Sequence, residues 1–161
     1  MKHIIELNVN GKMYEITVDP RRTLLEVLRE QLGLTGTKEG CDLGQCGTCT
    51  ILIDGRPALA CLTLAVEAQG KEVLTIEGLA HNGQLHILQQ AFIQFGAIQC
   101  GFCTPGMILS AKALLEENPH PTINEVKEAI GGNLCRCTGY VKIIEAISKA
   151  AEGEVTSTAK A

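Results

Sequence analysis

The chain has 161 residues, of which 45% are hydrophobic and 20% charged, so it can form one globular domain or two small ones. Its net charge of −4 provides no basic face for nucleic acid, and no apolar run is long enough to span a membrane. Aromatic residues make up only 3%, so the cores must be aliphatic and small, and metal centres could stabilise them.

The N-terminal part of the chain carries the pattern of a mixed α and β fold. Apolar residues alternate over residues 4–9 and again over 14–18, and the Asn10-Gly11 sequence between them is typical of a two-residue hairpin turn. Thr23 and Glu26 have the spacing of a helix capping box. The next predicted elements are a helix over 24–32, a loop over 35–49 and strands over 50–53, 58–61 and 73–76. This order is typical of a β-grasp fold.

The C-terminal part predicts helices only. Apolar residues at helical spacing, a proline at a first helical turn and a second capping box define four helical segments. They cover about residues 85–95, 105–115, 122–130 and 140–150. Four short helices in succession predict an antiparallel bundle. The remaining residues, 151–161, are small and polar and predict a disordered tail.

Four cysteines of the N-terminal part form a first candidate metal site with the spacing C-x4-C-x2-C-x11-C. They are Cys41, Cys46, Cys49 and Cys61. C-x4-C-x2-C is the spacing of plant-type [2Fe–2S] ferredoxins, and four thiolates are the ligand set of one cluster. Glycines give the loop freedom in φ and let N–H groups approach sulfur, at Gly40, Gly44 and Gly47. A zinc loop or a redox disulfide is the alternative, although zinc sites usually pair C-x2-C knuckles.

The other four cysteines form a second candidate site with the spacing C-x2-C-x31-C-x-C. They are Cys100, Cys103, Cys135 and Cys137. Both pairs lie between predicted helices, so an antiparallel arrangement would bring them to one end of the bundle, where helix N-termini favour an anionic cluster. A redox disulfide or zinc remains the alternative. Because no secretory signal core begins the chain, we expect a cytoplasmic protein, in which cysteines more often bind metal than form disulfides.

Together these residues resemble the small iron–sulfur subunit of the molybdenum hydroxylases, a family that includes xanthine dehydrogenase, aldehyde oxidoreductase, aerobic-type carbon monoxide dehydrogenase and 4-hydroxybenzoyl-CoA reductase. The resemblance covers roughly residues 4–150 and includes all eight cysteines. The matching strings are GTKEGC at 36–41, QCGTCT at 45–50, QCGFCTPG at 99–106 and GNLCRCTGY at 132–140.

The resemblance implies an α+β fold with two [2Fe–2S] clusters. A ferredoxin-like β-grasp domain over residues 1–75 would hold one cluster, and an all-α four-helix-bundle domain over residues 76–150 would hold the other. Gly101 would belong to the loop of the second cluster, and Gly40, Gly44 and Gly47 to the loop of the first. By the same resemblance, Gln99 and Cys137 would lie against a molybdopterin cofactor.

The resemblance also implies partners and a role. A large subunit would carry molybdopterin and a medium subunit FAD, in a dimer of heterotrimers, and this chain would pass single electrons between the two cofactors. It would belong to an oxidoreductase without being catalytic by itself. The competing hypothesis is a free-standing two-cluster electron carrier, which would not need a pterin contact at Gln99. A zinc-stapled structural module is a third possibility.

Overall fold

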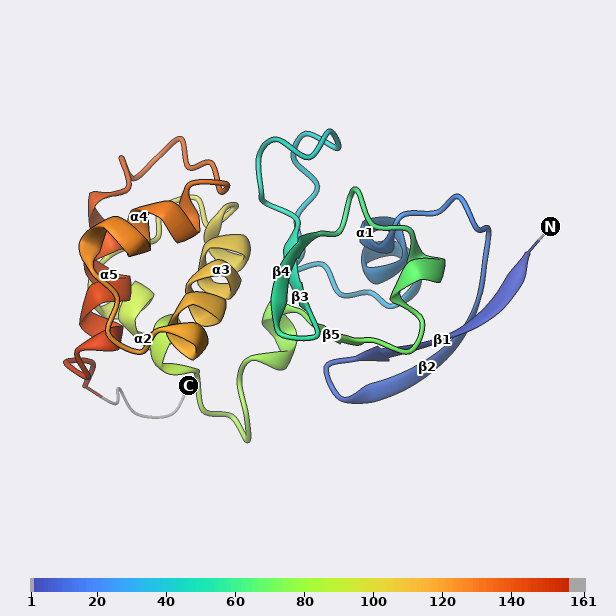
Figure 1. Cartoon of the computed structure of the whole chain (residues 1–161), viewed down its shortest axis with the longest axis horizontal. Helices are drawn as coiled ribbons and strands as arrows, with labels where there is room; N and C mark the ends of the chain where they lie inside the picture. The colour runs from blue at the N-terminus through green and yellow to red at the C-terminus, as the bar shows by residue number, and fades with distance from the viewer. Residues whose placement is uncertain (1, 157–161) are drawn as a thin grey trace.

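A computed structural model describes residues 2–156 and places a β-sheet part beside a helical part (Figure 1). Five strands form one sheet in the order β2-β1-β5-β3-β4. Their bounds are β1 His3–Val9, β2 Lys12–Val18, β3 Thr50–Ile53, β4 Arg56–Leu59 and β5 Glu72–Leu74. Strand β5 runs parallel to β1 and antiparallel to β3, so it joins the two hairpins into one mixed sheet.

The first hairpin has the predicted turn and alternation. Strands β1 and β2 pair antiparallel from His3 opposite Val18 to Val9 opposite Lys12. The turn residues Asn10 and Gly11 have φ values of 55° and 74°, the left-handed conformation that a tight hairpin turn requires. On β1, every second side chain from Ile5 to Val9 is buried, which confirms the predicted core face.

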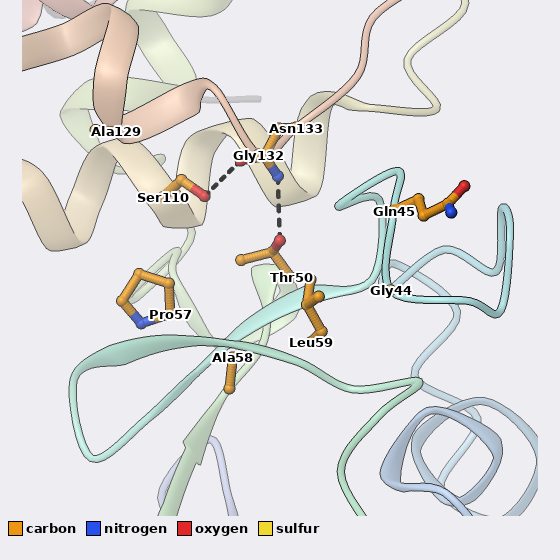
Figure 2. A pocket seen from close by; sticks show the side chains of 10 residues that line it. All are labelled: Gly44, Gln45, Thr50, Pro57, Ala58, Leu59, Ser110, Ala129, Gly132 and Asn133. Atoms are coloured by element: carbon orange, nitrogen blue, oxygen red, sulfur yellow. Dashed lines mark hydrogen bonds between the residues drawn. The ribbon is translucent and has the colours of Figure 1, made fainter.

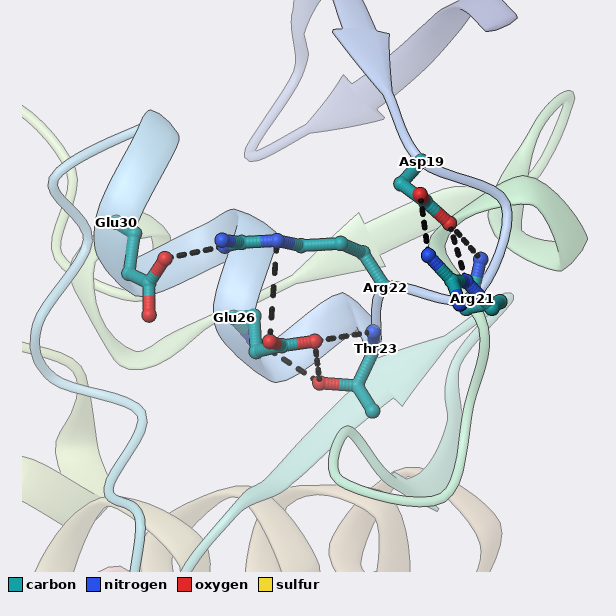
Figure 3. A network of polar contacts seen from close by, with 6 residues as sticks. All are labelled: Asp19, Arg21, Arg22, Thr23, Glu26 and Glu30. Carbon is teal, nitrogen blue, oxygen red and sulfur yellow. Dashed lines mark hydrogen bonds and ion pairs between the residues drawn. The ribbon is translucent and has the colours of Figure 1, made fainter. Parts of the chain in front are cut away.

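The predicted helix after Thr23 has a different geometry from the one expected. Only Leu24–Glu26 is α-helical (α1), and Val27–Gln31 is a π-helix (η1), in which the Leu32 N–H donates to the Val27 carbonyl. The capping box itself is present, because the Thr23 hydroxyl accepts from the Glu26 N–H and the Glu26 carboxylate accepts from the Thr23 N–H (Figure 3). Four buried aliphatic side chains of α1 and η1 join the sheet residues in one hydrophobic core.

Four α-helices pack around a second hydrophobic core in the C-terminal part. They are α2 Ile87–Gln94, α3 Thr104–Glu117, α4 Ile123–Ile130 and α5 Val141–Ala151. Two short 3-10 helices precede them: η2 Ala65–Ala68 lies between β4 and β5, and η3 Ile76–Gly78 lies between β5 and α2. The largest buried side chains of this core include Phe92, Met107, Ile143 and Ile147. Each helix lies within a few residues of its predicted range.

Helix α3 connects the two parts of the molecule, since it packs against β3 and β4 as well as against α2 and α4 (Figure 1). Beyond α5, Val155 packs on the helical core and the Thr156 N–H donates to Gln94 Oε1. The rest of the tail predicted to be disordered, residues 157–161, lies outside the described residues. Within residues 2–156, no helix is both long and apolar enough to cross a membrane.

Candidate metal centres

The first cysteine group is assembled by the loop before β3 together with the end of the β3–β4 hairpin. Cys41 and Cys46 are half-buried in the loop, whereas Cys49, just before β3, and Cys61, just after β4, are buried in the sheet core. The β3–β4 pairing brings the last two together, because Thr50 lies opposite Leu59 at the end of the ladder. Cys46 also lies near Cys49, and Cys41 lies against Cys46, so the four predicted ligands gather at this end of the β3–β4 hairpin.

Cys41 sits in a nest of backbone donors. The N–H groups of Leu43, Gln45 and Cys46 point at its Sγ atom over 3.3–3.4 Å. These hydrogen bonds lower the pKa of the Cys41 thiol to about 6, so it is largely a thiolate at neutral pH. A thiolate with three directed N–H groups is the environment expected for a ligand of an anionic iron–sulfur cluster.

The buried thiol of Cys49 has the opposite pKa shift. Burial raises the pKa of Cys49 to about 12, although a hydrogen bond from the backbone of Cys61 opposes that effect. A bound metal would have to displace this proton, so loading of the site would release protons to solvent.

The second cysteine group lines a cavity of about 140 Å³ between the helices and the first cysteine loop. Cys100 and Cys103 precede α3, and Cys135 and Cys137 lie between α4 and α5. The Sγ atoms of Cys100 and Cys137 are 3.5 Å apart. The cavity is also lined by Thr48, Phe102, Leu134 and Arg136. The structure thus brings all four predicted ligands to one space.

Local hydrogen bonds and burial shift the pKa values of the thiols in this second group in different directions. The Phe102 N–H lowers the pKa of Cys100, and burial raises that of Cys103 to about 12. Burial opposes ionisation of Cys135, but hydrogen bonds from the Thr138 hydroxyl and N–H outweigh it and lower its pKa. The contact with Cys100 raises the pKa of Cys137. Cys103 and Cys137, whose pKa values are raised, therefore each lie beside a cysteine whose pKa is lowered.

The thiols of both groups associate in pairs, and none forms a disulfide. The pairs are Cys41 with Cys46, Cys49 with Cys61, Cys100 with Cys137 and Cys103 with Cys135. Among the described residues, no three His, Cys, Asp or Glu side chains are arranged around a single metal ion. Two pairs of thiols per site suit a centre with two irons, each taking two thiolates, better than one tetrahedral zinc ion.

The loop glycines meet two different needs. Gly44, Gly47 and Gly101 have φ values of 73°, 69° and 80°, as the prediction of backbone freedom requires. For Gly40 that reason is wrong, because its φ is not positive. A Cβ there would instead lie 2.6 Å from Thr48 Oγ1 and 2.9 Å from Cys46 Sγ, so the position requires space beside the sulfur.

The two residues predicted to contact a pterin lie on the exposed side of the second group. Gln99 is exposed on the loop between α2 and α3, directly before Cys100. Cys137 is exposed at the mouth of the cavity. Exposed apolar side chains lie nearby in sequence, with Phe102 44%, Leu134 55% and Val141 70% accessible.

Sequence reasoning missed two residues that structure places between the sites. The Thr48 hydroxyl lies 3.2 Å from Cys46 Sγ, and Thr48 also lines the second cavity. Asn133 is buried and joins the second cysteine loop to the first through Gly47. The only available indication was that both residues lie within two positions of a cysteine, which does not identify contacts across the chain.

Comparisons with known proteins agree with this geometry. A family model described as a 2Fe-2S iron-sulfur cluster binding domain matches residues 7–75, and one described as a [2Fe-2S] binding domain matches residues 75–148. The small FeS subunit of nicotinate dehydrogenase from Eubacterium barkeri is 51% identical over 94% of this chain and 96% of its own length.

Two further relatives extend the comparison. The aldehyde oxidoreductase iron-sulfur-binding subunit PaoA of Escherichia coli K12 is 48% identical over 95% of this chain and 73% of its own. In the solved structure of quinoline 2-oxidoreductase from Pseudomonas putida 86, one chain superposes with a TM-score of 0.90 and 49% identity. That match covers 96% of this chain and 99% of the other.

Proposed function

Because the chain belongs to the family of small iron–sulfur subunits of molybdenum hydroxylases, we propose that it relays single electrons between a molybdopterin centre and FAD in an oxidoreductase complex. Its cofactors are two [2Fe–2S] clusters, each of which supplies one-electron redox chemistry when bound. The relatives are subunits of multi-subunit enzymes, which disfavours a free-standing carrier. The substrate is bound and transformed elsewhere in the complex.

The eight cysteines are the proposed ligands, and the observation that supports this assignment best is their pairing. The second group lines one cavity, and in the first group backbone N–H groups point at Cys41 Sγ. In this proposal the chain holds these thiolates, directs N–H donors at them and keeps water from the buried ones. Gly40, Gly44, Gly47 and Gly101 allow the loops to approach the sulfur atoms closely.

The two sites correspond to two proposed domains, residues 1–75 and 76–150. The separate hydrophobic cores and the two family-model ranges support this division. The mutual packing of α2, α3, α4 and α5 supports a four-helix bundle for the second domain.

The exposed face beside the second site is the proposed contact with a large, molybdopterin-binding subunit. Gln99 would hydrogen-bond the pterin there, and Cys137 would lie against it. A medium subunit would bring FAD to the first site, in a dimer of heterotrimers. We expect the complex to work in the cytoplasm, where cysteines that form no disulfide remain reduced.

Affinity purification of the tagged chain from cells that also express candidate large and medium subunits tests this proposal. We expect a stable complex that contains molybdenum, FAD and iron. A chain that purifies as a stable monomer and binds no large subunit would contradict the assignment as a subunit. Gln99→Ala should retain iron but weaken retention of the large subunit or its pterin, whereas the exposed Gln31→Ala serves as the matched control.

A further inference from the structure

The two cysteine loops contact each other directly, although they are more than 80 residues apart in sequence. The Leu134 N–H donates to the Cys46 carbonyl over 2.8 Å. A Cβ on Gly47 would lie 2.2 Å from the Gly132 carbonyl oxygen, so only a glycine lets the two backbones approach this closely. Each contact lies within three residues of a cysteine on both loops.

A buried asparagine side chain closes this contact (Figure 2). Asn133 is 4% exposed, and its Nδ2 donates to the Gly47 carbonyl at 2.8 Å and to Thr50 Oγ1 at 3.1 Å. Its Oδ1 accepts from the Ser110 hydroxyl at 2.8 Å. One amide thereby joins α3, β3 and both cysteine loops.

The hydrogen-bonding capacity of this side chain fits its surroundings closely. The amide has donors on one end and an acceptor on the other, and both ends have partners inside the protein. Leaving such buried groups unpaired is costly, so the amide strongly favours this single arrangement of the loops. Thr50 adds a hydrogen bond of its own to the Gly47 carbonyl at 2.7 Å.

The contact fixes more than a loop conformation, because it lies between the two candidate centres. Thr48 contacts Cys46 Sγ on one side and lines the cavity of the second cysteine group on the other. Electron tunnelling falls off exponentially with distance, so a small displacement of one loop would change the exchange rate between the centres.

We propose that Asn133 is a positioning residue that holds the two cluster-binding loops at a fixed separation and thereby sets the rate of electron exchange between the clusters. The proposal rests on the relay function given above. It concerns the separation of the sites, not the formation of either one, because the side-chain hydrogen bonds of Asn133 go to Gly47, Thr50 and Ser110 and not to a cysteine.

Electron paramagnetic resonance of the reduced, assembled complex tests this role. We expect Asn133→Ala to retain both iron–sulfur signals while the magnetic interaction between them weakens. In the partially reduced complex, where one cluster can pass its electron to the other, rapid freezing followed by the same spectroscopy should show exchange slowed several-fold. Ser110→Ala should have a smaller effect, since it leaves both Nδ2 donors paired. The matched control is Asn118→Ala, which removes a hydrogen-bonded asparagine at the far end of α3.

A second variant tests the same separation without removing a hydrogen-bonding group. Gly106 lies in α3, and a Cβ there would lie 2.6 Å from the Gly47 carbonyl oxygen. Gly106→Ala should push α3 away from the first loop while favouring the helix itself, so the interaction between the clusters should again weaken. If Asn133→Ala fails to assemble its clusters, Gly106→Ala tests instead whether the separation of the loops sets the coupling between them.

The possible results distinguish the positioning role of Asn133 from the relay function on which it rests. Unchanged coupling and exchange in Asn133→Ala, or in Gly106→Ala where the first variant fails, would overturn the positioning role. A purely structural role would lower the unfolding temperature and leave the coupling unchanged. Wild-type protein without two iron–sulfur signals would instead contradict the relay function itself.

Discussion

At the scale of single residues, Thr48 is placed to influence the first centre. Its hydroxyl lies 3.2 Å from Cys46 Sγ and 3.4 Å from the Lys38 carbonyl oxygen. A metal-bound Cys46 would have no thiol proton, so only the hydroxyl could donate in that contact. Such a hydrogen bond stabilises the extra negative charge of the reduced state.

Thr48→Val should therefore lower the reduction potential of the first cluster and leave that of the second unchanged. We expect a shift below about 59 mV, the value for a tenfold change in a one-electron equilibrium. Potentiometric titration followed by spectroscopy measures it, and Thr48→Ser, which keeps the hydroxyl, is the control. An unchanged potential would mean that the hydroxyl donates to Lys38 instead.

The ligand residues themselves were predictable from sequence, because iron–sulfur ligation requires four cysteines at constrained spacings. Asn133 was not predictable, since a polar residue in a glycine-rich loop has no periodic pattern to indicate its burial. Its partners Gly47 and Ser110 belong to other elements and became neighbours only through packing of α3 on the sheet. Long-range hydrogen bonds of this kind leave no local trace in the sequence.

At the scale of elements, capping residues fix where several helices begin. The Thr23 capping box starts α1, and the neighbouring Arg22 forms exposed ion pairs with Glu26 and Glu30 (Figure 3). The hydrogen bonds of the cap satisfy backbone groups that would otherwise be unpaired. The ion pairs are open to solvent and contribute little.

Thr23→Ala should lower the free energy of unfolding by about 1 kcal/mol. Arg22→Ala should cost less, because exposed ion pairs are typically worth under about 1 kcal/mol. Chemical denaturation of the two variants beside wild type measures both effects, and Thr23→Ser should restore most of the loss. A larger loss for Arg22→Ala than for Thr23→Ala would contradict this ranking.

Helix α2 begins at an unusual cap that should respond to pH. The His86 Nδ1 atom accepts from the Leu88 N–H at 3.2 Å, and burial, followed by the nearby Lys112 cation, lowers the pKa of His86. As pH falls below about 6.5, the unfolded chain therefore takes up this proton more readily than the folded chain. The contribution of the cap is present above that pH and is lost as pH falls through the lowered pKa.

His86→Asn keeps a capping acceptor and removes the titration. The unfolding temperature of wild type should therefore drop more than that of the variant when pH falls from about 7.5 to about 5.5. Thermal unfolding of the full chain across this range measures the difference. Equal slopes for the two proteins would show that His86 does not titrate with folding.

Element types were predictable from periodicity, but helix geometry and sheet order were not. Over two turns, apolar spacing does not distinguish an α-helix from the π-helix of Val27–Gln31. Strand β5 has only three residues, and its place between β1 and β3 depends on which exposed edges remain after both hairpins form. Local patterns contain no information on that choice.

At the scale of the whole molecule, the two centres have separate cores but touching loops. Cys46 contributes its side chain to the first site, whereas its carbonyl group accepts from Leu134. Removing the thiol therefore leaves the contact between the loops in place.

Cys46→Ser should remove the first cluster and retain the second, because the second group draws its thiols from the helical part only. Iron content should fall by about half, since each cluster needs its own four cysteines. Iron analysis and visible absorption measure the change, with Lys71→Ala, at an exposed residue between η2 and β5, as a substitution outside both sites. Loss of both clusters together would contradict independent assembly of the two sites.

The central claim is that the chain holds two [2Fe–2S] clusters and passes electrons between them. Low-temperature electron paramagnetic resonance of anaerobically purified, dithionite-reduced protein tests it most directly. The account predicts two S = 1/2 signals with different relaxation, one from each cysteine group. A well-folded protein that contains zinc instead of iron and gives neither signal would contradict it.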